Sequence, residues 1–154
     1  MEAVVALLDY EAERGKPMPS KNHAIIQSNL LVELTMNYRG TYQFLSEISL
    51  ENPRAVPDIA IFPPMQYDPL HDEIRLNQVP LGVIEIMSPS QTQDELIEKA
   101  DAYFRAGVQS YWLINPVFRI AHIMHSRDEY TNIIDGTLID KRLNISLPLA
   151  NLFQ

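Results

Sequence analysis

The sequence predicts a single mixed α/β (α+β) domain in which a central β-sheet is flanked by helices. Helical segments and short segments rich in β-branched and aromatic residues follow one another in the order helix, strands, helix, strands. The length of 154 residues is close to the usual size of one domain. No internal repeat and no Gly/Ser-rich linker divides the chain. We therefore expect residues 20–154 to form one domain behind an N-terminal arm of residues 1–19.

The first expected helix begins after Ser20, a typical N-cap residue, and runs to about Tyr38. Residues 11–19 before it contain one glycine and two prolines and predict an irregular arm. The helix carries an apolar stripe with a spacing of four residues, formed by Ile26, Leu30 and Leu34. Arg39–Gly40 is expected to end it.

Three strands are expected between the two helices, at residues 41–50, 58–62 and 81–87. The polar stretch at residues 66–78 is expected to be a surface loop. Residues 81–87 are almost all apolar, which is typical of a strand in the middle of a sheet.

The second expected helix starts at Thr92, which forms a capping-box pattern with Glu95, and ends at Gly107. Its apolar face is formed by Leu96, Ala100, Tyr103 and Phe104. A strand at residues 110–114 follows, and residues 118–124 are expected to pair with it as a hairpin. The C-terminal segment alternates again through Ile145, Leu147 and Leu149.

Composition limits the possible functions. The chain has no cysteine, which excludes disulfides and thiolate metal ligands. No apolar run reaches the roughly 20 residues of a membrane span, and the acidic start is unlike a signal peptide, so we expect a cytoplasmic protein without membrane contact. Twelve basic against twenty acidic side chains give a net charge of −8, which disfavours a generally basic nucleic-acid surface but allows a local basic groove.

Glu85 is the residue that departs most from its surroundings, because every neighbour within residues 83–87 is apolar. A buried unpaired carboxylate costs several kcal/mol, so Glu85 needs a cation or must be protonated. It is therefore a candidate metal ligand or catalytic acid. The alternative is an acid on a half-exposed edge strand.

Asp58 is the second candidate, at the start of a strand that follows Pro57. By itself the Pro-Asp pair is also common turn chemistry. Together with Glu85, however, it would supply two hard oxygen ligands at the ends of neighbouring strands. Such ligands suit Mg²⁺ or Mn²⁺ rather than zinc.

Lys99 lies at the border of the apolar face of the second helix. Its ammonium could reach the two carboxylates and a phosphate, or it could extend along the helix surface into water. His23, in the first turn of the first helix, is expected to be structural. His122 and His125 would lie on opposite faces of a strand, which disfavours a shared metal.

Several segments of the chain together resemble the Uma-two family, whose members are classed as restriction endonucleases with the PD-(D/E)-x-K nuclease fold. The similar segments are Arg54–Ile61, Val83–Ser90, Lys99 with Tyr103, Ala106–Val108, Tyr111–Pro116 and Leu147–Phe153. The resemblance runs from about Tyr10 to the end of the chain, and His23 corresponds to a family histidine. It implies a restriction-endonuclease-like domain over residues 20–154, with the arm of residues 1–19 shorter than in the family.

The resemblance also implies roles for individual residues. Asp58 and Glu85 would ligate the metal, and Glu47 would add a further carboxylate. The motif lysine normally follows two positions after the second acid, where this chain has Met87. Lys99 would take over its role, so that Asp58, Glu85 and Lys99 form the catalytic set.

The function expected from these observations is metal-dependent hydrolysis of phosphodiester bonds in DNA, with Mg²⁺ or Mn²⁺ as the cofactor and a homodimer as one possible assembly. Two alternatives remain open at this point. One is a catalytically inactive binding or assembly module with the nuclease fold, in which the acids form an ion-pair network. The other is a metal-dependent phosphatase or other hydrolase that uses the same acids.

Overall fold

Six strands form the central sheet, in the order β1-β3-β5-β6-β7-β8. The computed structural model describes residue 12 and residues 14–154, and the start of the family resemblance at about Tyr10 lies outside them. The helices are α2 (Lys21–Tyr38), α3 (Gln93–Ala106) and a final 3-10 helix, η1 (Leu149–Phe153). The strands are β1 (Gln43–Ser46), β2 (Ser49–Leu50), β3 (Ile59–Phe62), β4 (Arg75–Leu76), β5 (Gly82–Ile86), β6 (Ser110–Asn115), β7 (Ile120–Met124), β8 (Tyr130–Ile133), β9 (Thr137–Asp140) and β10 (Ile145–Pro148).

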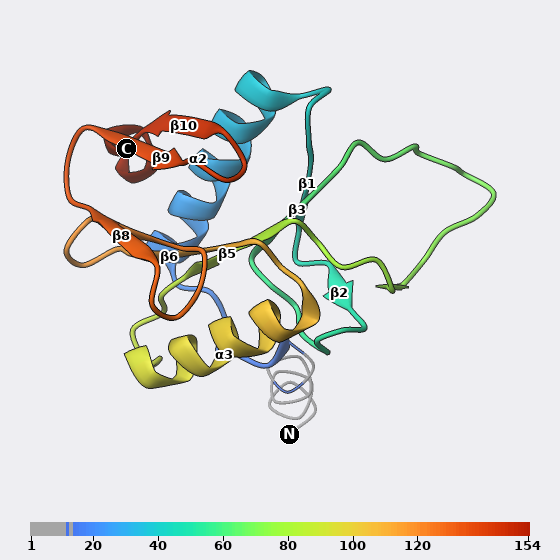
Figure 1. The fold of residues 1–154 in the computed structure, drawn as a ribbon, viewed down its shortest axis with the longest axis horizontal. Helices are drawn as coiled ribbons and strands as arrows, with labels where there is room; N and C mark the ends of the chain where they lie inside the picture. The colour runs from blue at the N-terminus through green and yellow to red at the C-terminus, as the bar shows by residue number, and fades with distance from the viewer. Residues whose placement is uncertain (1–11, 13) are drawn as a thin grey trace.

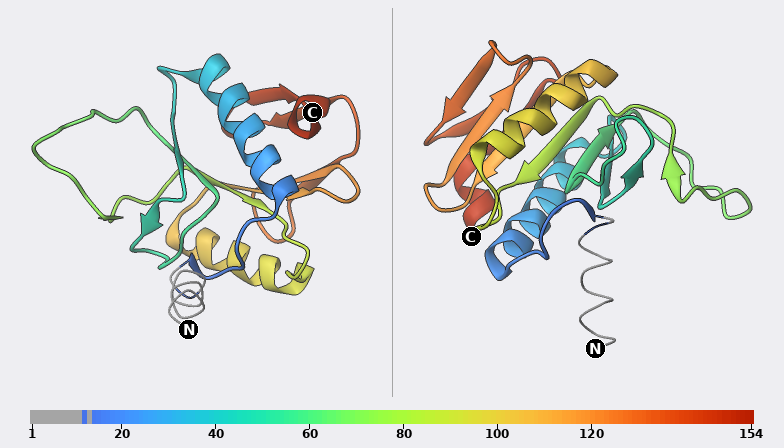
Figure 2. Two further views of the ribbon diagram at one scale, coloured as in Figure 1. Left: turned by 180° about the vertical axis from the view of Figure 1, so that it is seen from behind. Right: turned by 90° about the horizontal axis from the view of Figure 1, so that it is seen from below.

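The sheet is mixed, as expected. β5 and β6 run parallel, and α3 is the crossover that connects them. The other neighbouring strands of the sheet are antiparallel. Helix α2 covers one face of the sheet together with the β9–β10 hairpin, and α3 covers the other face (Figures 1 and 2). The expected single α/β domain is therefore confirmed.

Helix α2 begins as the sequence predicts. The Ser20 hydroxyl accepts a hydrogen bond from the His23 backbone N–H at 3.2 Å, which satisfies one free donor of the first turn. In the core on this face of the sheet, the apolar stripe of α2 packs against the apolar side chains that the central strands direct toward the helix. This core includes Ile26, Leu30, Leu34, Ile59, Ile61, Ile84, Ile86, Trp112 and Ile114.

Helix α3 is capped at both ends by the expected residues. The Thr92 hydroxyl accepts from the Glu95 N–H at 3.2 Å, and Gly107 ends the helix at φ 108°, a conformation that favours glycine. The core on this face includes Ala60, Phe62, Val83, Leu96, Ala100, Tyr103 and Tyr111. Side chains alternate along a strand, so the side chain of Glu85 belongs to the same face as that of Val83, the face that α3 covers.

Three expectations for the strands need correction. The strand expected at residues 41–50 is two strands, β1 and β2, because the backbone at Glu47 turns into the left-handed region at φ 54°. The polar loop contains the two-residue strand β4, which pairs in parallel with β2. The sequence does not predict strands β8 and β9, because each has only four residues and carries an exposed apolar residue, Tyr130 or Ile139, that obscures the alternation.

Within the part of the chain that the structure describes, none of the helices combines the length and the apolar character needed to cross a membrane.

Candidate active site

The register of the sheet places Asp58 beside Glu85. Strands β3 and β5 are antiparallel with Ile59 opposite Ile84, so that one further step along the ladder sets Asp58 opposite Glu85. Opposite residues of an antiparallel pair project from the same face. Both side chains are buried, at 0% and 1% exposure. Glu85 thus lies on a central strand, and the alternative of a half-exposed edge strand is wrong.

The cation between these acids is Lys16, which the sequence did not single out. Its Nζ lies 2.5 Å from Asp58 Oδ1 and 3.1 Å from Glu85 Oε2, and its side chain is 0% exposed. One ammonium therefore bridges both carboxylates. Because a buried carboxylate without a partner is strongly destabilising, this bridge is what allows both acids to stay inside the domain.

Asp58 is also held by three other groups. Its Oδ1 accepts from the Arg14 guanidinium at 3.1 Å, while its Oδ2 accepts from the Ile86 backbone N–H at 2.7 Å. His23 Nε2 lies 3.1 Å from the same Oδ2. His23 is thus part of the site rather than a purely structural histidine of the helix, because the first turn of α2 points its ring at Asp58.

The ionisation of the site follows from these contacts. Burial by itself would raise the pKa of Asp58, but the contact with His23 and the charge of Lys16 outweigh it and lower this pKa to about 2. Burial dominates at Glu85 and, with the charge of Asp58, raises its pKa despite Lys16. Burial would lower the pKa of Lys16, but the charges of Glu85 and Asp58 raise it, so that Lys16 stays an ammonium ion.

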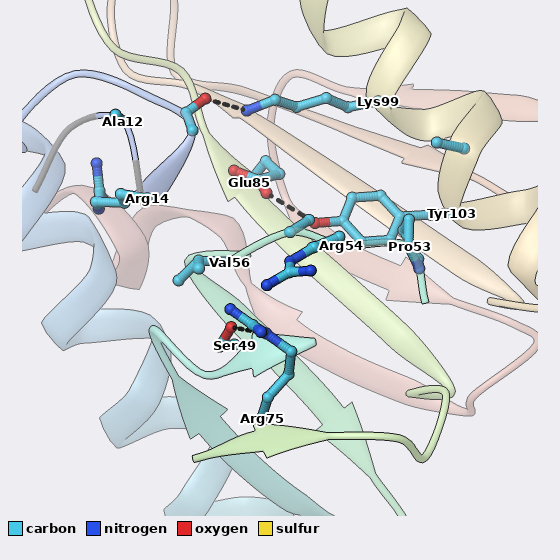
Figure 3. Close-up of a pocket in the computed structure, with 13 residues that line it drawn as sticks. Ala12, Arg14, Ser49, Pro53, Arg54, Val56, Arg75, Glu85, Lys99 and Tyr103 are labelled. Carbon is cyan, nitrogen blue, oxygen red and sulfur yellow. Dashed lines mark hydrogen bonds between the residues drawn. The ribbon is translucent and has the colours of Figure 1, made fainter. Parts of the chain in front are cut away.

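Helix α3 contributes two residues. The Tyr103 hydroxyl makes a long contact of 3.5 Å with Glu85 Oε1. Burial and the charge of Glu85 raise the pKa of Tyr103 well above its usual value, so the hydroxyl remains a donor. Lys99 donates to the Gly15 carbonyl at 3.3 Å instead of to either carboxylate (Figure 3). Its charge nevertheless acts on Glu85, so Lys99 lies beside the acids without bridging them.

Glu47 lies at the edge of this group. Its carboxylate is engaged by Arg14, whose Nε lies 3.0 Å from Oε2 and whose Nη2 lies 2.7 Å from Oε1. The left-handed backbone at Glu47 turns the chain between β1 and β2 at this point. Arg14 therefore links Glu47 to Asp58, and the two acids share a guanidinium.

A cavity of about 540 Å³ opens next to Glu85. Its walls come from the N-terminal arm, the β2–β3 connection, β4 and α3 (Figure 3). Among the described residues that line it, the charged side chains are mostly basic: Arg14, Arg54, Arg75 and Lys99 lie around the acid Glu85. In a chain with a net charge of −8, this is a local concentration of positive charge suited to an anion.

Asp58 and Glu85 provide the ligand chemistry that Mg²⁺ or Mn²⁺ prefers, because both are hard oxygen donors directed at one point. In the folded chain that point is held by the Lys16 ammonium. Within residue 12 and residues 14–154, no group of three or more His, Asp or Glu side chains is arranged to hold a metal ion. The donor set fits the metal, and a protein cation stands in the place where the two carboxylates converge.

Comparison with known proteins supports the resemblance found in the sequence. A putative nuclease of the DUF820 family from Anabaena variabilis has a similar solved structure, with a TM-score of 0.75 and 22% sequence identity. The similarity covers 89% of this chain and 83% of that one, and it shows that the two chains share a mixed α/β fold. No curated protein matches this chain.

The family is established by sequence. Residues 5–146 match the family model of Uma2, which is described as "Putative restriction endonuclease". This match covers more than half of the 154 residues. The fold and the family together support a nuclease, and the chain belongs to the Uma2 family.

Proposed function

We propose that this protein is a metal-dependent endonuclease that hydrolyses phosphodiester bonds in DNA, with its active site at Asp58 and Glu85. One observation carries the proposal. Two carboxylates, which the family resemblance would make the acids of the nuclease motif, lie side by side, buried, and directed at one cation. Removing two carboxylates from water costs several kcal/mol. Such a buried pair is therefore expected where function requires it.

Asp58 and Glu85 would hold Mg²⁺ or Mn²⁺, which when bound supplies Lewis-acid activation of the phosphate and of a water molecule. Glu47 would contribute a further carboxylate once Arg14 releases it. The Asp58 carboxylate stays ionised at neutral pH because its pKa is low, and it can therefore bind a cation without first losing a proton.

Lys99 would act on the substrate. It lines the cavity next to Glu85 and carries a charge on a helix that packs against the sheet. From this place its ammonium can stabilise the negative charge that develops on a phosphate during hydrolysis. Arg54 and Arg75 line the same cavity and would bind the neighbouring phosphates of the strand.

A second candidate is a catalytically inactive nuclease-fold module that binds or assembles with other chains. It is favoured by the contacts of Lys16 and Arg14, which already neutralise Asp58 and Glu85 within the protein. In this candidate the acids serve as a structural ion-pair network.

The test is DNA cleavage by the purified protein with Mg²⁺, Mn²⁺ or EDTA, on single- and double-stranded DNA. Glu85→Gln preserves the shape of the side chain and is expected to reduce cleavage at least about a hundredfold. The matched control is Glu73→Gln, which removes the same charge from an exposed site and should cleave like the wild type.

Cleavage that requires the metal and is lost in Glu85→Gln supports the nuclease. Cleavage that persists in Glu85→Gln, or in EDTA, would assign the activity to a contaminant or to another site. Absence of cleavage on all substrates, together with absence of metal binding, would support the inactive module.

A further inference from the structure

We propose that Lys16 and the divalent metal compete for the same place between Asp58 and Glu85, so that the segment Gly15–Pro17 closes the metal site and must move away before the metal binds. The proposal rests on the proposed function, because it assumes that these two acids bind a metal. It adds a control of that site by the protein's own N-terminal arm.

The competition follows from the use of three of the four carboxylate oxygens. Asp58 Oδ1 contacts Lys16 and Arg14, and its Oδ2 accepts from a backbone N–H. Glu85 Oε2 accepts from Lys16. Mg²⁺ requires oxygens at about 2.0–2.1 Å, whereas the ammonium lies at 2.5 and 3.1 Å from the oxygens that face each other. The same lone pairs cannot serve both cations, and two positive charges at one point repel each other.

The arm has contacts that hold it closed. Lys99 donates to the Gly15 carbonyl, Arg14 Nη1 donates to the Pro17 carbonyl, and Arg14 is paired with Glu47. Arg14 is also paired with Asp58, at 3.1 Å. The Lys16 bridge adds two buried ion pairs to these contacts, so the arm is held to the acids by both of its cationic side chains. Gly15 has φ 72°, a left-handed conformation that glycine adopts without steric cost, and no described residue beyond its chain neighbours lies within 4 Å of a Cβ placed there.

The structure also offers a place for the displaced ammonium. Lys16 and its neighbours in the arm line a second hollow of about 730 Å³ along α3. Glu95 and Glu98 line the same hollow. A lysine that leaves the two buried acids would therefore meet two carboxylates at the surface, which lowers the cost of its release.

The first test is calorimetric titration of Mn²⁺ into the wild type, Lys16→Met and Lys21→Met. Lys21→Met is the matched control, because Lys21 is an exposed lysine at the start of α2 and its loss changes the net charge equally. Lys16→Met is expected to bind Mn²⁺ at least about tenfold more tightly than Lys21→Met, since no ammonium has to be displaced. This titration measures Mn²⁺ binding and does not depend on cleavage activity.

The second test uses the wild type, so it does not depend on the folding of a variant. Lysines are acetylated briefly with and without saturating Mn²⁺, and each site is quantified by mass spectrometry. Lys16, fully buried in the structure, is expected to be protected without the metal and to become several times more reactive with it. Lys21 and Lys141, both exposed, are the internal references and should not change.

Tighter binding by Lys16→Met, or release of Lys16 by Mn²⁺, supports the proposal. If Lys16→Met and Lys21→Met bind Mn²⁺ equally and Lys16 stays protected in the metal complex of the wild type, the competition is overturned. The proposed metal site would still stand in that case. Absence of Mn²⁺ binding to all three proteins overturns both the competition and the proposed metal-dependent function.

Discussion

Lys16 and Asp58 are 42 residues apart in sequence, yet the Lys16 ammonium lies 2.5 Å from Asp58 Oδ1 inside the domain. This contact fastens the N-terminal arm to the start of β3. It also supplies the positive charge that the sequence requires for Glu85 but does not identify.

Lys16→Met is expected to lower the free energy of unfolding by about 3–5 kcal/mol, because it leaves two buried carboxylates without their shared cation. Chemical denaturation followed by circular dichroism measures this loss. Lys21→Met should stay within about 0.5 kcal/mol of the wild type. An unchanged unfolding midpoint for Lys16→Met would mean that the bridge contributes nothing to the fold.

Lys99→Ala is expected to lower the rate of DNA cleavage at saturating metal by about 10²–10³-fold, because a charge on the phosphate loses its stabilisation. Lys99→Arg keeps the charge and should recover part of the rate. Single-turnover kinetics at saturating DNA separate this effect from binding. Equal rates for Lys99→Ala and the wild type would remove Lys99 from the catalytic set.

Arg54→Ala and Arg75→Ala are expected to weaken binding of a DNA oligonucleotide and to reduce its dependence on salt. Each lost phosphate contact should lower the slope of log K against log salt concentration by about 1. Fluorescence anisotropy at several salt concentrations measures both effects. Arg105→Ala, on the exposed side of α3, is the control. Identical slopes for all variants would place the DNA away from the cavity.

Asp140 provides a pH prediction away from the active site. Its carboxylate accepts from Trp112 Nε1 at 2.8 Å and from the Leu143 N–H at 3.0 Å. Burial would raise the pKa of Asp140, but these hydrogen bonds outweigh it and lower the pKa below its usual value. A lowered pKa contributes stability above the unfolded value near pH 4, and this stability is lost as the pH falls through the folded pKa.

Asp140→Asn should therefore be less stable than the wild type by about 1–3 kcal/mol at pH 7, and the difference should shrink below about pH 4. Urea denaturation between pH 7 and pH 3 measures the difference. Asp135→Asn, at an exposed site, serves as the control. A difference that is constant over this range would show that the charge of Asp140 does not matter.

Much of the fold could be predicted because it depends on local chemistry. The N-caps Ser20 and Thr92 and the left-handed Gly107 mark the helix ends, since each satisfies backbone groups within one turn. The apolar sequence of β5 indicated a central strand, and the structure confirms it. The break at Glu47 could not be predicted, because a contact with Arg14, 33 residues away, accompanies that turn.

The candidate acids could be found in the sequence for a physical reason. A carboxylate at Glu85 inside an apolar strand needs a partner wherever the strand packs. Asp58 becomes a stronger candidate ligand because it lies at the start of a neighbouring strand. The nearness of the two residues depends on the β3–β5 register, which pairs Ile59 with Ile84. The register is decided by the packing of whole strands and not by either residue.

The sequence by itself determined the fold class, the helix ends and the need for a cation at Glu85, because these follow from local patterns and from the cost of burying charge. Only the tertiary structure decided which cation it is. Lys99 has the helical position that suggests the role, but its ammonium contacts Gly15, while Lys16 reaches both acids from an arm 69 residues before Glu85. A contact between such distant residues depends on how the chain closes around its core, and no sequence spacing encodes it.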